Sequence, residues 1–110
     1  MCDCGQHLMH DAVQHQMKNL TKWDLKLDER GQYLFQHFDF GNKDKNSFLK
    51  AKYFVDDLAK LAEKNGHHPD ITFGWGYCDI VLFTHTYKGL TETDFNMAKE
   101  INELYSKTYF

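Results

Sequence analysis

The spacing of hydrophobic and polar positions changes several times along the chain, and each change predicts a new element. Residues 11 to 20 carry apolar side chains at helical spacing with Asp11 as a cap, which predicts a short first helix. From Lys22 onward, apolar residues occupy every second position, as in a half-buried strand. Residues 28 to 31 predict a hairpin turn, and residues 33 to 40 predict a second, aromatic-rich strand. The core-facing positions predicted for the first strand are Trp23, Leu25 and Leu27.

The strongest periodic signal spans residues 46 to 65, where the apolar side chains form one stripe of an amphipathic helix. Asn46 or Ser47 can cap its start, and Gly66 can adopt the left-handed conformation that ends a helix. Burial of a large apolar side chain contributes roughly 1.5 to 3 kcal/mol, so this helix is predicted to be a main part of the core. The stripe consists of Phe48, Ala51, Phe54, Val55, Leu58, Leu61 and Ala62.

The last third of the chain predicts two strands and a helix. Residues 71 to 84 are rich in aromatic and β-branched types, and the Gly74-Trp75-Gly76 sequence predicts a tight turn between two strands. Thr91 can cap a final helix through Asp94, with Leu90 and Phe95 as a hydrophobic staple. The buried stripe predicted for this helix consists of Phe95, Ala98, Ile101, Leu104 and Tyr105.

The predicted order is therefore helix, strand, strand, helix, strand, strand, helix. Hairpins imply an antiparallel sheet, and the amphipathic helices need a sheet face to cover, so the predicted class is α+β with three helices on one face of a four-stranded sheet. A chain of 110 residues fits one domain, for which residues 1 to 10 are expected to form a flexible N-terminus.

Composition narrows the classes of function. The hydrophobic content of 42% and charged content of 26% are ordinary for a globular protein. The net charge is −3 and the lysines are scattered, which argues against direct binding of nucleic acid. No stretch has the length and apolarity of a membrane span, and no secretory signal is found. The three cysteines make an odd count, which favours a reducing compartment, so the expected location is cytoplasmic.

Candidate chemistry gathers at the end of the long predicted helix. Glu63 and His67 are four residues apart, so if the last turn holds, the carboxylate can orient the imidazole and favour its protonated form. Pro69 favours an extended backbone at His68 and so should send the two adjacent histidines in different directions. His85 lies at the end of a predicted strand. The three histidines are therefore able to meet in one pocket.

Each candidate also has a purely structural explanation. An isolated histidine near a helix end more often caps or packs, and Glu63 alone is more often a solvated helix residue. Trp75 is more often part of a turn or core, and Asp94 is fully explained as a cap.

The combination is more specific than its parts. Their spacing resembles the signature of the pterin-4a-carbinolamine dehydratases. The pattern is, in order, Glu63, three residues, His67-His68-Pro69, five residues, Trp75, nine residues, His85, eight residues and Asp94. Further similarities run from about residue 12 to 105 and include Trp23, Phe38-Asp39-Phe40, Leu61-Ala62-Glu63 and Gly89-Leu90-Thr91. Two positions depart from the pattern: Ile71 replaces the tryptophan of many animal members, and Thr93 replaces an arginine of some.

The resemblance implies an enzyme that removes water from 4a-hydroxytetrahydropterin to give quinonoid dihydropterin in tetrahydrobiopterin recycling, without a metal or cofactor. It implies that His67 and His85 form an acid/base pair, that His68 holds the pterin, and that Glu63 orients His67. Pro69, Trp75 and Asp94 are expected to shape the substrate pocket. It also implies a homodimer or homotetramer that extends its sheet across subunits, with residues 33 to 40 as a candidate edge, and an aromatic amino acid hydroxylase as a possible partner.

Two other classes of function stay open. Cys2, Cys4, His7 and His10 can supply zinc ligands, although their spacing is not a common structural-zinc pattern. Some members of the family act as dimerization cofactors of a transcription factor, so a non-catalytic interaction module is the alternative to the enzyme.

Overall fold

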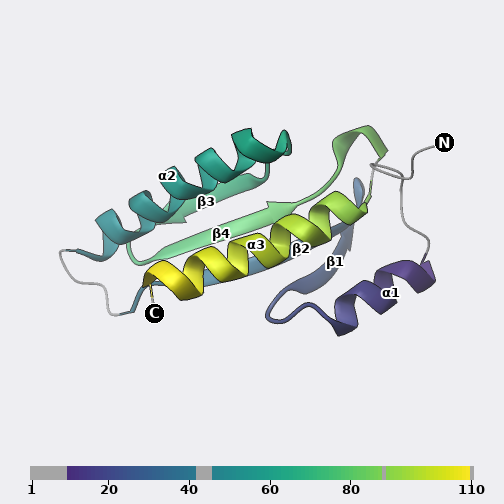
Figure 1. Cartoon of the computed structure of the whole chain (residues 1–110), viewed down its shortest axis with the longest axis horizontal. Helices are drawn as coiled ribbons and strands as arrows, with labels where there is room; N and C mark the ends of the chain where they lie inside the picture. Colours follow the sequence, from purple (N-terminus) through teal and green to yellow (C-terminus); the bar gives the residue numbers. More distant parts are fainter. Residues whose placement is uncertain (1–9, 42–45, 88, 110) are drawn as a thin grey trace.

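The elements occur in the predicted order, which confirms the α+β class (Figure 1). The computed structural model describes residues 10–41, 46–87 and 89–109. In this part of the chain the elements are α1 (His10–Lys18), β1 (Asp24–Asp28), β2 (Gly31–Asp39), α2 (Ser47–Asn65), β3 (Asp70–Gly74), β4 (Tyr77–Leu82), the short 3-10 helix η1 (His85–Tyr87) and α3 (Glu92–Tyr109). None of these helices is both long and apolar enough to cross a membrane.

The four strands form one antiparallel sheet in the order β1-β2-β4-β3. The two central strands, β2 and β4, come from the two different hairpins, and their pairing sets Leu34 opposite Leu82 and Phe38 opposite Cys78. The prediction that residues 33 to 40 line a free edge is wrong, because β2 pairs on both sides. The exposed edges belong to β1 and β3.

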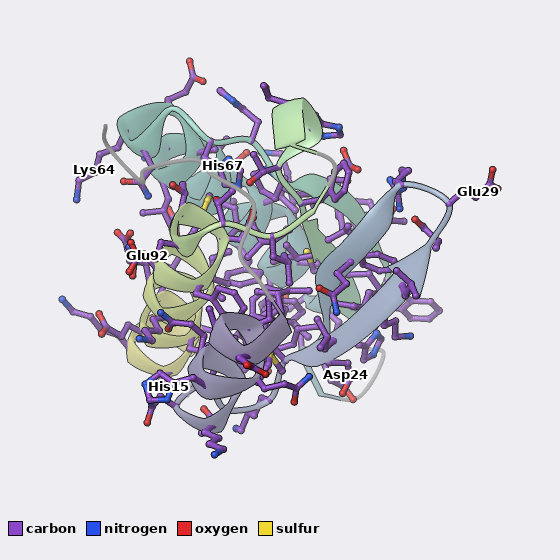
Figure 2. The ribbon with its side chains drawn as sticks, turned by 90° about the vertical axis from the view of Figure 1, so that its right-hand side faces the viewer. His15, Asp24, Glu29, Lys64, His67 and Glu92 are labelled. Carbon is purple, nitrogen blue, oxygen red and sulfur yellow. The ribbon has the colours of Figure 1, made fainter. Side chains whose placement is uncertain are left out.

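One face of the sheet carries the core. Alternate residues of the central strands are buried there: Leu34, Gln36 and Phe38 on β2, and Cys78, Ile80 and Leu82 on β4. The helices gather over this face, and Figures 1 and 2 show them on the same side of the sheet. Their buried residues include Val13, Phe54, Leu58, Phe95 and Ile101.

Two predicted core positions are exposed. Leu27 lies on the predicted core-facing side of β1 but is 73% exposed, because it is near the hairpin end of an edge strand. Phe48 begins the apolar stripe of α2 and is 46% exposed, although its ring lies 5.7 Å from the ring of Phe73. Hydrophobic spacing identified the correct face in both cases, but it carries no information about where the covering layer ends.

The end of α2 determines how the chain enters the histidine segment. Gly66 has φ 62° and ψ 27°, the left-handed conformation that was predicted to end the helix. The N–H groups of Gly66 and His67 both donate to the carbonyl of Ala62, the latter at 3.2 Å. His67 therefore lies outside the helix.

We predict that Gly66→Ala lowers the free energy of unfolding by about 1 kcal/mol, because an alanine side chain disfavours positive φ. No atom lies within 4 Å of the position that a Cβ would occupy, so the cost would come from the backbone alone. The matched variant is Gly66→Asn, which tolerates this conformation better and should lose less. Urea unfolding measures both variants. Equal losses would contradict the backbone explanation.

Candidate active site

The signature residues near His67 lie at one end of the sheet. His67, His68 and Pro69 join the end of α2 to β3, and Asp70, the first residue of β3, pairs with Val81 near the end of β4. The chain then passes from β4 through η1 to α3. Three segments that are distant in sequence thus meet at this end, and Figure 2 shows His67 there, beside the end of α2.

Asp94 is the centre of this site. It lies in the first turn of α3 and is fully buried. Its Oδ1 lies 2.5 Å from Nε2 of His67. Its Oδ2 accepts hydrogen bonds from the Thr84 hydroxyl at 2.7 Å and from the Thr91 backbone N–H at 2.9 Å. One carboxylate therefore caps α3, as predicted, and also binds a side chain from each of two other segments.

The hydrogen bond to Asp94 defines what His67 can do. An ionised carboxylate only accepts hydrogen bonds, so Nε2 of His67 carries the proton in that bond. The other ring nitrogen, Nδ1, can then accept or release a proton while the ring stays in place. The His67 side chain is 13% exposed, so it is sheltered but still reachable from solvent.

Glu63 contacts a different histidine from the one predicted. Its Oε2 lies 2.5 Å from Nε2 of His68, and both side chains are largely exposed. The predicted pairing of Glu63 with His67 assumed that the helix continued to residue 67. Because α2 ends at Asn65, the rule for residues four apart in a helix does not apply.

His85 begins η1 and is exposed. Its ring lies edge-on to that of Phe83, with 4.9 Å between centroids. With Glu29, Arg30 and Phe83 it lines a cavity of about 390 Å³. No hydrogen bond or ring contact within the described segments joins two of the three histidines, but His85 follows Thr84, which binds the same carboxylate as His67. The three histidines thus lie at the same end of the sheet, but each has its own set of contacts.

Trp75 lies away from the other signature residues. It occupies the turn between β3 and β4 and is half-exposed. His68 and Pro69 precede β3, whereas Trp75 follows it, and the five residues of that strand span about 15 Å. The structure therefore does not bring Trp75 together with the histidines, whereas Pro69 stays next to His68.

Two polar residues of this region, Thr84 and Arg30, were not found from the sequence. Thr84 donates to Asp94 through its hydroxyl, and Arg30 reaches the cavity beside His85 from the β1–β2 hairpin. Thr84 could have been noticed as the hydroxyl residue directly before His85. Nothing in the local pattern marks Arg30, because its neighbours in this region come from distant parts of the chain.

Metal and thiol chemistry have little support in the described part of the chain. No group of three or more histidine, cysteine or acidic side chains there is arranged to hold a metal ion. The alternative zinc ligands Cys2, Cys4 and His7, and the side chain of His10, lie outside the described residues. Cys78 is buried in the core, and this burial raises the pKa of its thiol to about 12, so it stays protonated at neutral pH.

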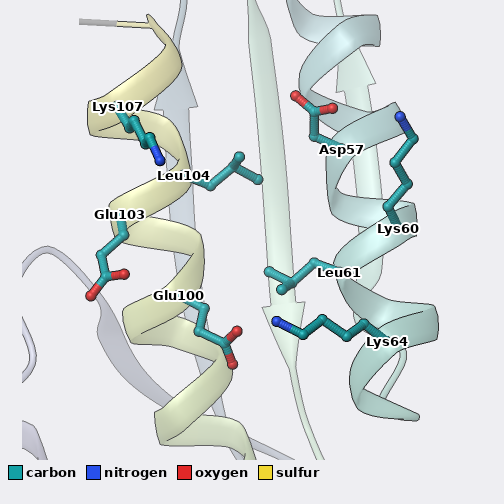
Figure 3. Close-up of a pocket in the computed structure, with 8 residues that line it drawn as sticks. All are labelled: Asp57, Lys60, Leu61, Lys64, Glu100, Glu103, Leu104 and Lys107. Atoms are coloured by element: carbon teal, nitrogen blue, oxygen red, sulfur yellow. The ribbon is translucent and has the colours of Figure 1, made fainter.

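A second cavity lies on another part of the surface. It has a volume of about 450 Å³ and runs between α2 and α3, where acidic and basic side chains from both helices surround two leucines (Figure 3). None of the signature residues lines it. Its lining consists of Asp57, Lys60, Leu61, Lys64, Glu100, Glu103, Leu104 and Lys107.

Comparison with known proteins assigns the family. A family model described as pterin 4 alpha carbinolamine dehydratase matches residues 6–104. The chain belongs to this family. Relatives named "Putative pterin-4-alpha-carbinolamine dehydratase" include proteins from Rubrobacter xylanophilus and Methylococcus capsulatus. The former is 38% identical, covering 88% of this chain and 83% of the relative, and the latter is 36% identical, covering 88% and 79%.

Solved structures of pterin-4a-carbinolamine dehydratase relatives have the same fold. One is described as a transcriptional coactivator/pterin dehydratase from Brucella melitensis, with a TM-score of 0.77 and 29% identity over 90% of this chain and 98% of that one. Another is described as a pterin dehydratase-like protein identified as a RuBisCO assembly factor in the alpha-carboxysome. Its TM-score is 0.61, and it is 32% identical over 76% of this chain and 88% of that one.

We predict that Asp94→Ala lowers the free energy of unfolding by about 3 kcal/mol, because it leaves the Thr84 hydroxyl, the Thr91 N–H and the His67 ring without their acceptor. Thermal and urea unfolding measure the loss. Glu92→Ala, an acidic residue of the same helical turn, is the matched control and should lose less than about 1 kcal/mol. Similar losses in both variants would show that Asp94 acts only through the helix dipole.

Proposed function

We propose that this protein eliminates water from 4a-hydroxytetrahydropterin and forms quinonoid dihydropterin, with histidines as general acid and base. Membership of the family gives the substrate class. The observation that carries the proposal is the hydrogen bond between His67 and the buried Asp94, because a ring fixed at Nε2 keeps Nδ1 available for proton transfer.

The reaction requires two proton transfers. An acid gives a proton to the 4a-hydroxyl as its bond to carbon C4a breaks, and the group leaves as water. A base takes the proton from N5, whose electrons form the new N5–C4a double bond. Imidazole suits both steps at neutral pH, since its ordinary pKa near 6.5 leaves useful amounts of both forms. The lone pair of N5 supplies the electrons, so this chemistry requires neither a metal nor a redox cofactor.

The proposed roles follow from the contacts of each residue. His67 and His85 form the acid/base pair, and His68 with Pro69 holds the pterin at the mouth of the site. Asp94 is a positioning residue for His67, a role first assigned to Glu63. Glu63 instead pairs with His68, so it is proposed to orient the substrate-holding histidine. Trp75, at the far turn, has no proposed role in this subunit's site.

The biological setting is also proposed from the family. The substrate is the product of aromatic amino acid hydroxylases, so the protein would act in tetrahydrobiopterin recycling in the cytoplasm. A homodimer or homotetramer is proposed, and the exposed edges of β1 and β3 are the strands available for pairing between subunits.

Generating 4a-hydroxytetrahydropterin in situ with a phenylalanine hydroxylase and following its ultraviolet decay tests the activity. Wild type should exceed the spontaneous rate, and His67→Ala and His85→Ala should each lower the catalysed rate about 100-fold or more, because each removes one proton-transfer group. His15→Ala, which changes an exposed histidine of α1, is the matched control and should keep the wild-type rate. A folded wild type that only matches the spontaneous rate would refute the proposed activity.

A non-catalytic interaction module is the second candidate function. Two solved relatives favour it, since one is described as a transcriptional coactivator and the other as an assembly factor. His67→Ala protein separates the candidates, because it should lose dehydration while keeping any role that depends only on the folded surface.

A further inference from the structure

The face of the sheet that the helices leave uncovered has a composition of its own (Figures 1 and 2). Residues paired directly across an antiparallel sheet lie on the same face, so the strand register identifies the members of this open face. The central strands supply partly or fully exposed aromatic rings, and every strand supplies at least one aspartate. The rings are Tyr33, Phe35, His37 and Tyr77, and the aspartates are Asp24, Asp28, Asp39, Asp70 and Asp79.

Arg30 shows which chemical group this open face binds. Its guanidinium donates from Nη2 to Asp28 Oδ2 at 2.9 Å, and its Nη1 lies 3.6 Å from Asp70 Oδ2. The same group lies 5.5 Å from the centroid of the Tyr33 ring. Ring faces and carboxylates both attract positive charge, so this arrangement is favourable for a planar cation. At the hairpin end of the open face, the chain's own arginine thus occupies a site made of a ring and two aspartates.

The other end of the open face has the same groups without a cation. His37 lies directly opposite Asp79, and the next open-face pair along the two strands is Asp39 and Tyr77. The Tyr77 ring lies across Gly74, where a Cβ would come within 2.5 Å of Tyr77 Cε1, and it is nearly parallel to the His37 ring at 14°. Diagonal neighbours in a sheet are about 7 to 8 Å apart, so one guanidinium can reach both carboxylates. Within the described segments, no lysine or arginine pairs with either aspartate.

Both aspartates at this end keep an oxygen for an external donor. His37 Nδ1 lies 2.5 Å from Asp79 Oδ1, and since an ionised carboxylate only accepts hydrogen bonds, Nδ1 carries the proton. Asp39 Oδ1 accepts the backbone N–H of Gly41 at 2.9 Å. Each contact uses one oxygen of its carboxylate, and the Asp79 side chain is 31% exposed. A cation that arrives from solvent can therefore bind the second oxygen of each.

We propose that His37, Asp39, Tyr77 and Asp79 bind an arginine side chain from an extended, arginine-rich segment of a partner protein. Charge complementarity favours this occupant, because the aspartates attract cationic segments and repel anionic ones. Arginine is favoured over lysine, because a planar guanidinium can stack on the Tyr77 ring while it donates to a carboxylate. None of the signature residues lies in this surface, so the inference does not depend on the proposed dehydration.

The proposed binding surface is compatible with the proposed oligomer. Pairing of subunits through the edges of β1 and β3 would extend the sheet and leave its open face uncovered. Side chains at every second position of an extended segment project to the same side at intervals of about 7 Å. A segment with arginine at alternate positions can therefore lie along the open face with its guanidinium groups directed toward the aspartates.

Fluorescence anisotropy with the full chain at low ionic strength tests the proposal. The probe is a labelled peptide in which arginine and glycine alternate. Two matched peptides replace every arginine by lysine, which keeps the charge, or by citrulline, which keeps the shape without the charge. We expect wild type to bind the arginine peptide about threefold more tightly than the lysine peptide and about tenfold or more above the citrulline peptide.

Substitutions on the open face test its location. The double variant Asp39→Asn, Asp79→Asn keeps the side-chain size and should weaken binding of the arginine peptide about tenfold. Tyr77→Leu should bring the ratio of the arginine and lysine dissociation constants close to one, because it removes the ring. The matched control is Glu92→Gln, Glu103→Gln, which removes two carboxylates from exposed positions of α3 and should keep both the affinity and the ratio.

Three results would overturn the proposal. Equal binding of the arginine and citrulline peptides by wild type would show that no cation site exists. Equal weakening in the two double variants would show that only the net charge of the protein matters. An unchanged ratio in Tyr77→Leu would exclude stacking on that ring. This ratio is measured within one variant, so a loss of folded protein does not alter it.

Discussion

The hydrogen bonds of the buried Asp94 hold the candidate site together. One carboxylate binds the backbone at the start of α3, the Thr84 hydroxyl after β4 and the His67 ring after α2. A carboxylate without water around it is costly unless its oxygens are occupied, so these three segments satisfy a requirement of the fold as well as of the site. The position of His67 is therefore fixed by the same group that begins the last helix.

Much of the fold follows from local rules. The period of the apolar residues predicts the helices and strands, Gly66 predicts the end of α2, and the Thr91–Asp94 pair predicts the start of α3. The failures concern long-range arrangement. The central position of β2 depends on its pairing with β4, from the other hairpin, which no local pattern encodes. The exposure of Leu27 depends likewise on how far the helices extend over the sheet.

The candidate site was predictable as a set of residues and less so as a set of contacts. His67, His68 and Pro69 were correctly expected at the end of the long helix. The partners of the two histidines were not, because the left-handed residue before them turns the chain out of the helix and so invalidates the helical spacing. Glu29 and Arg30 were overlooked, because only the folded sheet brings the first hairpin close to His85.

Asp94 both caps α3 and binds His67, and this affects how inactive relatives can be recognised. A lineage that abandons catalysis is free to replace histidines, but replacing this aspartate would also remove the cap of α3 and leave buried donors unpaired. Selection for a folded protein alone would retain it. In a sequence with this fold, an aspartate at this position therefore indicates that the start of the last helix is capped. Only the histidines indicate whether the protein keeps its catalytic activity.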